Sequence, residues 1–324
     1  MDGNSKKYRL STAPIIKVGS KLVPNKLKPK IISLLLRYRH ILWAGSTIIS
    51  FVPTYVCNYQ CPYCFIHTKF NYAKVFPRNS EHSWEEWVQA FDKLPQSFIH
   101  ITGGEPLSYP ELIPLLENMP KKHTILAVAT NLTLHVDELS KLPNRRFFIS
   151  TSFHSHMTDK ESFGERVLKM KRAGFPVSVS VVAYPDRIAL LPEFKRYFED
   201  EIGVRFVVNP YLDPFYKYSK EEADIVEKYV PSRIKVGWAE DTRPKTCVAG
   251  SKYFQFLPNG DVYTCLSGIY YATSDLHEGI CENPGRFYLG NLFDGSFKPL
   301  DGPMTCSCPC SERCDQGYGR VKLI

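Results

Sequence analysis

The chain has 324 residues, of which 44% are hydrophobic and 23% charged, a composition that excludes a disordered or fibrous protein. The formal net charge is +8, and residues 1–40 alone carry ten Lys and Arg against one Asp. We predict a basic N-terminal extension over residues 1–46 that can contact an anionic partner or a membrane surface. The apolar runs at 31–36 and 41–52 fall short of the roughly 20 residues that span a bilayer, so we predict a cytoplasmic protein, peripheral at the membrane at most.

Between residues 47 and 230, β-rich runs alternate with amphipathic helical segments. Two helices have predicted N-terminal caps, Ser83 with Glu86 and Thr158 with Glu161, and Gly174 is predicted to end the second. Alternating strands and helices indicate a parallel sheet, and six units are too few to close an eight-stranded barrel. The predicted fold class is therefore α/β, a partial (βα)6 TIM-like barrel over residues 47–230. Its strands are predicted at 47–56, 98–102, 124–130, 146–153, 177–183 and 204–209.

Residues 231–324 are predicted to form a small cysteine-rich C-terminal domain. Asn259-Gly260 lies between two β-rich runs and predicts a β-hairpin. The segment is too short to bury much apolar core, so we expect a metal site to hold it together. The ten cysteines of the chain occur mostly in tight groups, which indicates metal binding in a reducing compartment rather than disulfides.

The first cysteine group is Cys57, Cys61 and Cys64, directly after the first predicted strand. In parallel α/β folds the C-terminal ends of the strands face the active site. Three thiolates can hold three irons of a [4Fe–4S] cluster and leave the fourth iron open for an exchangeable ligand, as a catalytic zinc keeps an open position. A zinc site that also uses His67 is the alternative.

A second motif, Gly103-Gly104-Glu105-Pro106, follows the second predicted strand. Two glycines permit a ligand to approach the backbone closely, and Glu105 offers a carboxylate to a cation. Pro106 stiffens the chain where it leaves this motif. One βα unit after the cysteines, the motif can face the same open iron.

Together the C-x3-C-x2-C motif with Tyr63 and the G-G-E-P motif resemble the radical S-adenosylmethionine (radical SAM) superfamily over residues 48–210. The resemblance implies that the open iron binds S-adenosylmethionine, that Gly103 to Pro106 receive its amino group, and that an electron donor such as flavodoxin or ferredoxin reduces the cluster. A 5′-deoxyadenosyl radical then abstracts hydrogen from the substrate. The resemblance also makes Asn131, Ser150 and Ser152 candidates for cofactor contacts. His154 and His156, past the fourth strand, either touch substrate or belong to a surface loop.

The cysteines after residue 246 resemble the auxiliary-cluster domain called SPASM, or its shorter form called twitch. The resemblance implies one auxiliary [4Fe–4S] cluster bound by Cys247, Cys265 and two of the terminal group, although the terminal spacing departs from the family pattern. Cys281 stands alone, as a buried apolar residue or a hydrogen-atom donor to a substrate radical. The terminal candidate ligands are Cys306, Cys308, Cys310 and Cys314.

We predict an enzyme that abstracts hydrogen from a C–H bond of a small-molecule or a lipid- or sugar-linked biosynthetic intermediate and so oxidises, rearranges or epimerises it. The segment before the barrel is too short and too basic for a peptide-binding domain, but a maturase that modifies peptides is the alternative. A zinc-stabilised binding protein is a third hypothesis. Nucleic acid is disfavoured as a partner because the basic residues are not interleaved with stacking aromatic residues.

Overall fold

The computed structural model describes residues 47–64, 66, 72–143, 146–211, 216–230, 245–273 and 284–306. All of them belong to one of the chain's two compact units, Ser46–Gln316 with Arg320–Ile324. The predicted basic extension, His67, Cys281, Cys308, Cys310 and Cys314 lie outside the described residues, as does the side chain of Cys306.

Six parallel strands follow one another along the chain and across the sheet, in the order β1 to β6. This sequential parallel order confirms the predicted partial α/β barrel. Two predicted strands have the observed bounds, 124–130 and 177–183. The six strands are β1 (Thr47–Phe51), β2 (Ser97–Ile101), β3 (Thr124–Thr130), β4 (Phe148–Ser152), β5 (Val177–Ala183) and β6 (Arg205–Pro210).

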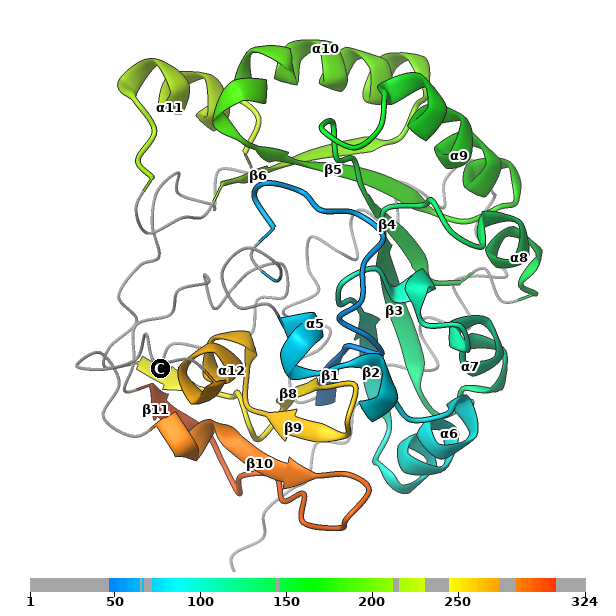
Figure 1. Ribbon diagram of the computed structural model, residues 1–324, viewed down its shortest axis with the longest axis vertical. Helices are drawn as coiled ribbons and strands as arrows, with labels where there is room; N and C mark the ends of the chain where they lie inside the picture. The colour runs from blue at the N-terminus through cyan, green and yellow to red at the C-terminus, as the bar shows by residue number, and fades with distance from the viewer. Residues whose placement is uncertain are drawn as a thin grey trace, which may run out of the picture. The chain divides into compact units, whose positions relative to one another are not determined.

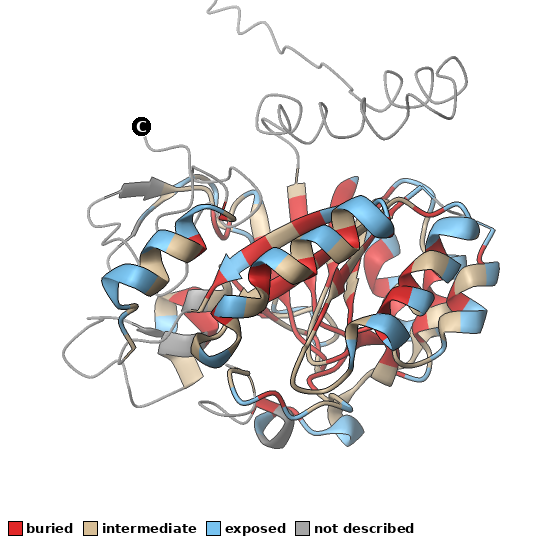
Figure 2. Cartoon of the chain, turned by 90° about the horizontal axis from the view of Figure 1, so that it is seen from above, coloured by how far each residue is buried: buried red, intermediate tan, exposed pale blue. Residues whose placement is uncertain are grey.

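Helices cover the outer face of these strands (Figure 1). Figure 2 shows that the strands are largely buried while the helices expose their outward faces. After α10 the chain continues into a π-helical turn, Arg196–Glu201. The helices of this unit are α5 (Tyr72–Val75), α6 (Trp84–Lys93), α7 (Leu112–Asn118), α8 (Val136–Lys141), α9 (Lys160–Arg172), α10 (Leu191–Lys195) and α11 (Lys220–Glu227), with short 3-10 turns η1 (Arg78–Ser80), η2 (Pro106–Ser108) and η3 (Pro185–Leu190). Within the described residues, no helix is long and apolar enough to cross a bilayer.

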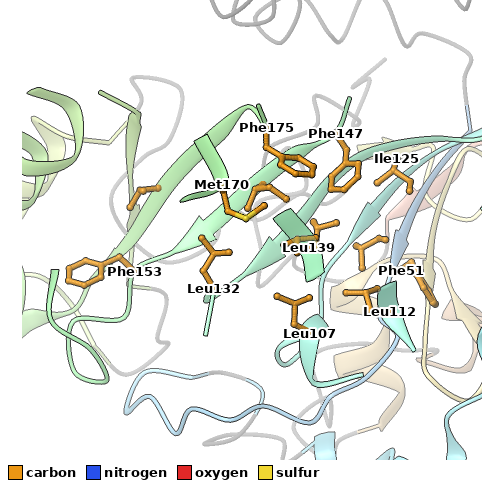
Figure 3. Close-up of a cluster of buried hydrophobic side chains, with 14 of the residues drawn as sticks. Phe51, Leu107, Leu112, Ile125, Leu132, Leu139, Phe147, Phe153, Met170 and Phe175 are labelled. Atoms are coloured by element: carbon orange, nitrogen blue, oxygen red, sulfur yellow. The ribbon is translucent and has the colours of Figure 1, made fainter. Parts of the chain in front are cut away.

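The main hydrophobic core lies between the sheet and these helices (Figure 3). In β4 and β5 the buried residues alternate with partly buried ones; Ile149, Val179, Val181 and Ala183 belong to this core. This alternation is expected because successive strand residues point to opposite faces of a sheet. The outer face is therefore packed with apolar side chains, and the inner face at β4 and β5 is not.

The helix caps show where the local sequence was sufficient to predict the end of a helix. The capping box predicted for α6 is present: Ser83 accepts from Glu86 N, and the Glu86 side chain accepts from Ser83 N. Gly174, with φ of +93°, lies just past the end of α9 as predicted. The predicted Thr158 cap is wrong by one residue, because the carboxylate of Asp159 accepts from Ser162 N at 2.7 Å.

The C-terminal strands extend the same sheet. Strand β8 (Tyr253–Phe256) pairs in parallel with β1, on the side away from β2, and β9 (Asp261–Tyr263) and β10 (Tyr288–Asn291) follow in antiparallel pairs. The Asn259-Gly260 hairpin is confirmed, with Gly260 at φ of +85°. A separate two-stranded sheet joins β7 (Lys245–Cys247) to β11 (Met304–Cys306). Helix α12 (Leu266–Thr273) and turn η6 (Pro284–Phe287) complete this region. The domain boundary at residue 231 remains a prediction.

Candidate active site

The candidate active site lies at the C-terminal ends of β1, β2 and β3, where three loops meet. Backbone hydrogen bonds join the first two loops: Gly104 N donates to Thr54 O at 3.1 Å, and Glu105 N donates to Val56 O at 2.9 Å. The cysteine motif follows β1 and the G-G-E-P motif follows β2, so the two motifs lie side by side. In parallel α/β barrels this edge is where active sites are built.

The two glycines permit this close approach. A Cβ on Gly103 would lie 2.4 Å from Thr54 O, and Gly103 also has φ of +148°. A Cβ on Gly104 would lie 2.4 Å from Tyr55 O and 2.5 Å from Val56 O. In the structure the two glycines admit the backbone of the cysteine loop, and the close approach of a ligand stays a prediction.

Glu105 joins the second loop to the third. Its carboxylate is 1% exposed and accepts hydrogen bonds from Leu107 N, Thr130 Oγ1 and Asn131 N at 3.0, 2.7 and 2.6 Å. Burial raises the pKa of Glu105 to about 7, although these hydrogen bonds favour the carboxylate. Both oxygens thus accept hydrogen bonds from the protein itself, and the predicted contact of Glu105 with a cation stays a prediction.

The three motif cysteines share one electrostatic environment. Burial is the main cause that raises the pKa of Cys57 to about 11 and that of Cys61 to about 12, and the neighbouring Cys64 contributes to both shifts. Among the described residues, no three His, Cys, Asp or Glu side chains converge as ligands of one metal ion do. A [4Fe–4S] cluster takes one thiolate at each iron, so its ligands do not need to converge on one atom. Three neighbouring thiols at the end of β1 fit this donor set.

Asn131 begins the loop after β3 and is 3% exposed. Its side-chain amide donates to Asn58 Oδ1 at 2.9 Å, and its Oδ1 accepts from Thr133 N at 3.1 Å. Asn58 directly follows Cys57 in sequence, so this contact ties the cysteine loop to the end of β3. The cofactor contact of Asn131 stays a prediction, and in the structure its amide is bonded to protein groups.

Ser150 and Ser152 lie on the inner, partly exposed face of β4. The neighbouring positions of β5, paired in register, are Ser178 and Ser180. Serines on adjacent strands leave this part of the inner face small and polar, which suits a ligand-lined surface.

His154 and His156 belong to a continuous aromatic band at the ends of β4, β5 and β6. Tyr63, in the cysteine loop, bonds through its hydroxyl to His154 Nδ1 at 3.0 Å. Its ring lies 5.3 Å from that of Tyr184, which lies 5.0 Å from Tyr211. Burial lowers the pKa of His154 to about 4. We define the aromatic band as Tyr63, His154, His156, Tyr184 and Tyr211.

Asp186 holds the second histidine of the band. His156 Nε2 lies 3.0 Å from Asp186 Oδ2 and 3.1 Å from Oδ1. Asp186 follows β5, so this contact connects the ends of β4 and β5. The sequence did not indicate the pair, because its members are 30 positions apart.

Arg166 of α9 is a further charged group at the site that the sequence did not single out. Its NH2 group donates to Thr158 Oγ1 at 3.2 Å, and its charge lowers the pKa of the nearby Tyr59 in the cysteine loop, where burial acts more strongly in the opposite direction. Its Nε is buried without a hydrogen-bond partner in the described part of the chain. Nothing in its spacing distinguishes it from other helical arginines.

The second cysteine set occupies neighbouring segments. Gly250 and Thr264 are close, since a Cβ on Gly250 would lie 2.8 Å from Thr264 Cγ2. The chain after Cys247 therefore runs beside the chain before Cys265. In the β7–β11 ladder Met304 is opposite Cys247, and Cys306 is two positions further along β11.

A partial parallel barrel with a three-cysteine loop and a glycine-rich turn at adjacent strand ends defines an enzyme class built around an iron–sulfur cluster. The family model described as the radical SAM superfamily matches residues 51–238. The chain belongs to this superfamily and is one of its enzymes, and the family implies a [4Fe–4S] cluster with S-adenosylmethionine.

Known proteins agree with this assignment. GTP 3′,8-cyclase of Aquifex aeolicus (strain VF5) is 27% identical over 173 residues, which are 48% of this chain and 54% of that protein. The chain thus spans about half the length of this curated relative. The structure of anSMEcpe with bound AdoMet and Cp18Cys peptide matches with a TM-score of 0.51 and 15% identity, over 78% of this chain and 79% of that one. Streptococcus suis SuiB bound to precursor peptide SuiA matches with a TM-score of 0.51 and 16% identity, over 91% and 74%. At such identities the two structures show a shared fold.

Proposed function

We propose that this enzyme abstracts hydrogen from a C–H bond of a small molecule that carries a ring and hydroxyl groups, such as a sugar- or nucleotide-linked biosynthetic intermediate. The aromatic band is the observation that supports this substrate class. Tyrosine and histidine combine an apolar ring with a polar tip, so together they suit a ligand with C–H faces and hydroxyl groups. The curated relative is named for GTP, a substrate of this chemical kind.

The residues of the three loops have distinct proposed tasks. Cys57, Cys61 and Cys64 would hold three irons, and Gly103 to Pro106 would receive the amino group of S-adenosylmethionine. Arg166 would pair with its carboxylate, because guanidinium groups bind carboxylates in fork geometry. Ser150 and Ser152 would line the inner face beside it. When bound, the cluster and S-adenosylmethionine supply the electron, the bond cleavage and the radical that abstracts hydrogen.

We also propose one auxiliary [4Fe–4S] cluster held by Cys247, Cys265 and two of the terminal cysteines. The side-by-side course of the segments that carry Cys247 and Cys265 supports this arrangement. The register of β11 adds support for Cys306 as a third ligand. We propose in addition that Cys281 donates a hydrogen atom to the substrate radical. Flavodoxin or ferredoxin is the proposed reductant.

The first experiment is anaerobic reconstitution followed by iron counting and detection of 5′-deoxyadenosine. We expect about eight irons per chain and cleavage of S-adenosylmethionine with a chemical reductant. Changing Cys57, Cys61 and Cys64 to Ala should abolish cleavage and leave about four irons. Zinc in place of iron, without cleavage, would overturn the proposal.

A deuterium-transfer assay tests the substrate class. The enzyme is incubated with S-adenosylmethionine and either the small metabolites or the peptides of cells grown on deuterated medium. We expect deuterium in 5′-deoxyadenosine from the small-metabolite fraction, and Tyr184→Ala should lower that transfer without lowering substrate-free cleavage. Transfer from the peptide fraction alone would establish the peptide-modifying alternative instead.

A further inference from the structure

Three side chains form a closed ring of hydrogen bonds between the cysteine loop and the loop after β3. Asn58 Nδ2 donates to Thr133 Oγ1 at 2.7 Å, and Thr133 Oγ1 donates to Asn131 Oδ1. Asn131 Nδ2 completes the ring by donating to Asn58 Oδ1 at 2.9 Å. Each group donates once and accepts once around the ring, and hydrogen bonds arranged in this way strengthen one another.

Glu105 connects this ring to the G-G-E-P loop. Its carboxylate accepts from Asn131 N and from Thr130 Oγ1, and Thr130 Oγ1 in turn accepts from Leu132 N at 2.9 Å. The G-G-E-P loop is itself bonded to the cysteine loop through Gly104 N and Glu105 N. The ends of β1, β2 and β3 are therefore joined pairwise, and the three loops form a closed circuit.

The backbone between Asn131 and Thr133 has an energetically unfavourable conformation. Leu132, between Asn131 and Thr133, has φ of +55° and is fully buried. Left-handed backbone at a non-glycine residue costs roughly 1–2 kcal/mol. This conformation places the side chains of Asn131 and Thr133, on either side of Leu132, in the same ring of hydrogen bonds.

We infer that Asn58, Thr133 and Asn131 are positioning residues that fix the cysteine loop over the ends of β2 and β3. The inference rests on the proposed cluster at Cys57, Cys61 and Cys64. Because Asn58 adjoins Cys57 in the chain, the ring would fix the orientation of the loop whose three cysteines would hold the cluster beside the G-G-E-P backbone. Without it, the loop would keep its cysteines but lose the fixed orientation that binding of S-adenosylmethionine requires.

The test uses the reconstituted full chain and three variants. Thr133→Val removes the hydroxyl that closes the ring at nearly constant volume, and Thr133→Ser retains it. Asn58→Ala opens the same ring from an exposed position, where folding is least at risk. The readout is the change that S-adenosylmethionine causes in the electron paramagnetic resonance spectrum of the reduced cluster, titrated to give an apparent Kd, together with the thermal midpoint and iron content.

We expect Thr133→Val and Asn58→Ala to raise the apparent Kd about tenfold at wild-type iron content, which corresponds to about 1.4 kcal/mol and to the loss of one or two hydrogen bonds. Thr133→Ser should restore the wild-type titration. A lower thermal midpoint with an unchanged titration would overturn the positioning role and leave a structural one. Wild-type protein that holds no iron would instead refute the cluster proposal, and the two failures are therefore distinguishable.

Discussion

Gly104 is the residue at which a single methyl group is expected to separate the two motifs. In Gly104→Ala the new Cβ would meet two backbone oxygens at 2.4 and 2.5 Å, and neither can move without shifting the cysteine loop. We expect a loss of about 1–3 kcal/mol of folding stability, together with lower iron incorporation. Gly302→Ala is the matched control, because nothing lies within 4 Å of its Cβ position. Equal thermal midpoints and iron contents for the two variants would contradict this account.

His123 carries a prediction about pH. Its Nε2 lies 2.8 Å from Phe91 O, so Nε2 carries the proton, and its buried Nδ1 has no partner in the described part of the chain. Burial lowers its pKa from the ordinary value near 6.5. The unfolded chain therefore takes up a proton more readily than the native protein, and stability should fall as pH drops through 6.5.

The comparison of wild type with His123→Gln between pH 7.5 and 5.5 isolates this effect. We expect the thermal midpoint of the wild type to fall more steeply over that interval than the midpoint of the variant. Parallel pH dependences for the two proteins would show that His123 titrates alike in both states.

At the residue scale, the sequence suggested candidate ligands but not the side chains that support them. Asn131 could be proposed from its position at a strand end. Its partner Asn58 is 73 positions away, and nothing in either segment indicates the pairing, because it depends on how β1 and β3 are placed around β2. The need for glycine at positions 103 and 104 likewise depends on the loop after β1, which is distant in sequence.

At the element scale, Asp159 offers a test of local folding. Its carboxylate caps α9 by accepting from Ser162 N. We expect Asp159→Ala to cost about 1 kcal/mol, and Asp159→Asn to keep most of the stability, since asparagine is an equally good cap. Urea unfolding measures both. An Asn variant as unstable as the Ala variant would mean that charge at the helix N-terminus, rather than the cap, is what matters.

Elements were predictable where a periodic pattern and a local signal agreed. The strand at 124–130 is a short apolar run, the strand at 177–183 begins with alternating valine and serine, and the α6 capping box is complete in sequence. The cap of α9 was displaced by one residue because Thr158 and Asp159 are both good caps, and only the observed geometry distinguishes them. The pairing of β8 with β1 has no local signal, since parallel pairing is decided by the open edge of the barrel.

At the scale of the whole molecule, Phe256 tests whether the C-terminal strands unfold together with the barrel. It is fully buried on β8 and packs against Phe91 of α6 and Phe297. We expect Phe256→Ala to cost about 3–5 kcal/mol and to lower one cooperative transition, seen alike by tryptophan fluorescence and by circular dichroism. Tyr253→Phe is the mild control on the same strand. Two separate transitions would indicate that the region after residue 231 is an independent folding unit.

The place of β8 in the sheet has a consequence for synthesis on the ribosome. Ile48 of β1 pairs with Tyr253, 205 residues later, and at roughly 5–20 residues per second the partner strand emerges about 10–40 s after β1. Throughout that interval the nascent barrel presents the unpaired backbone of β1 to its surroundings, and such edges promote aggregation. Chains that stall or are truncated before residue 253 would keep that edge permanently, so the fold needs protection of this edge by chaperones until β8 has been synthesised.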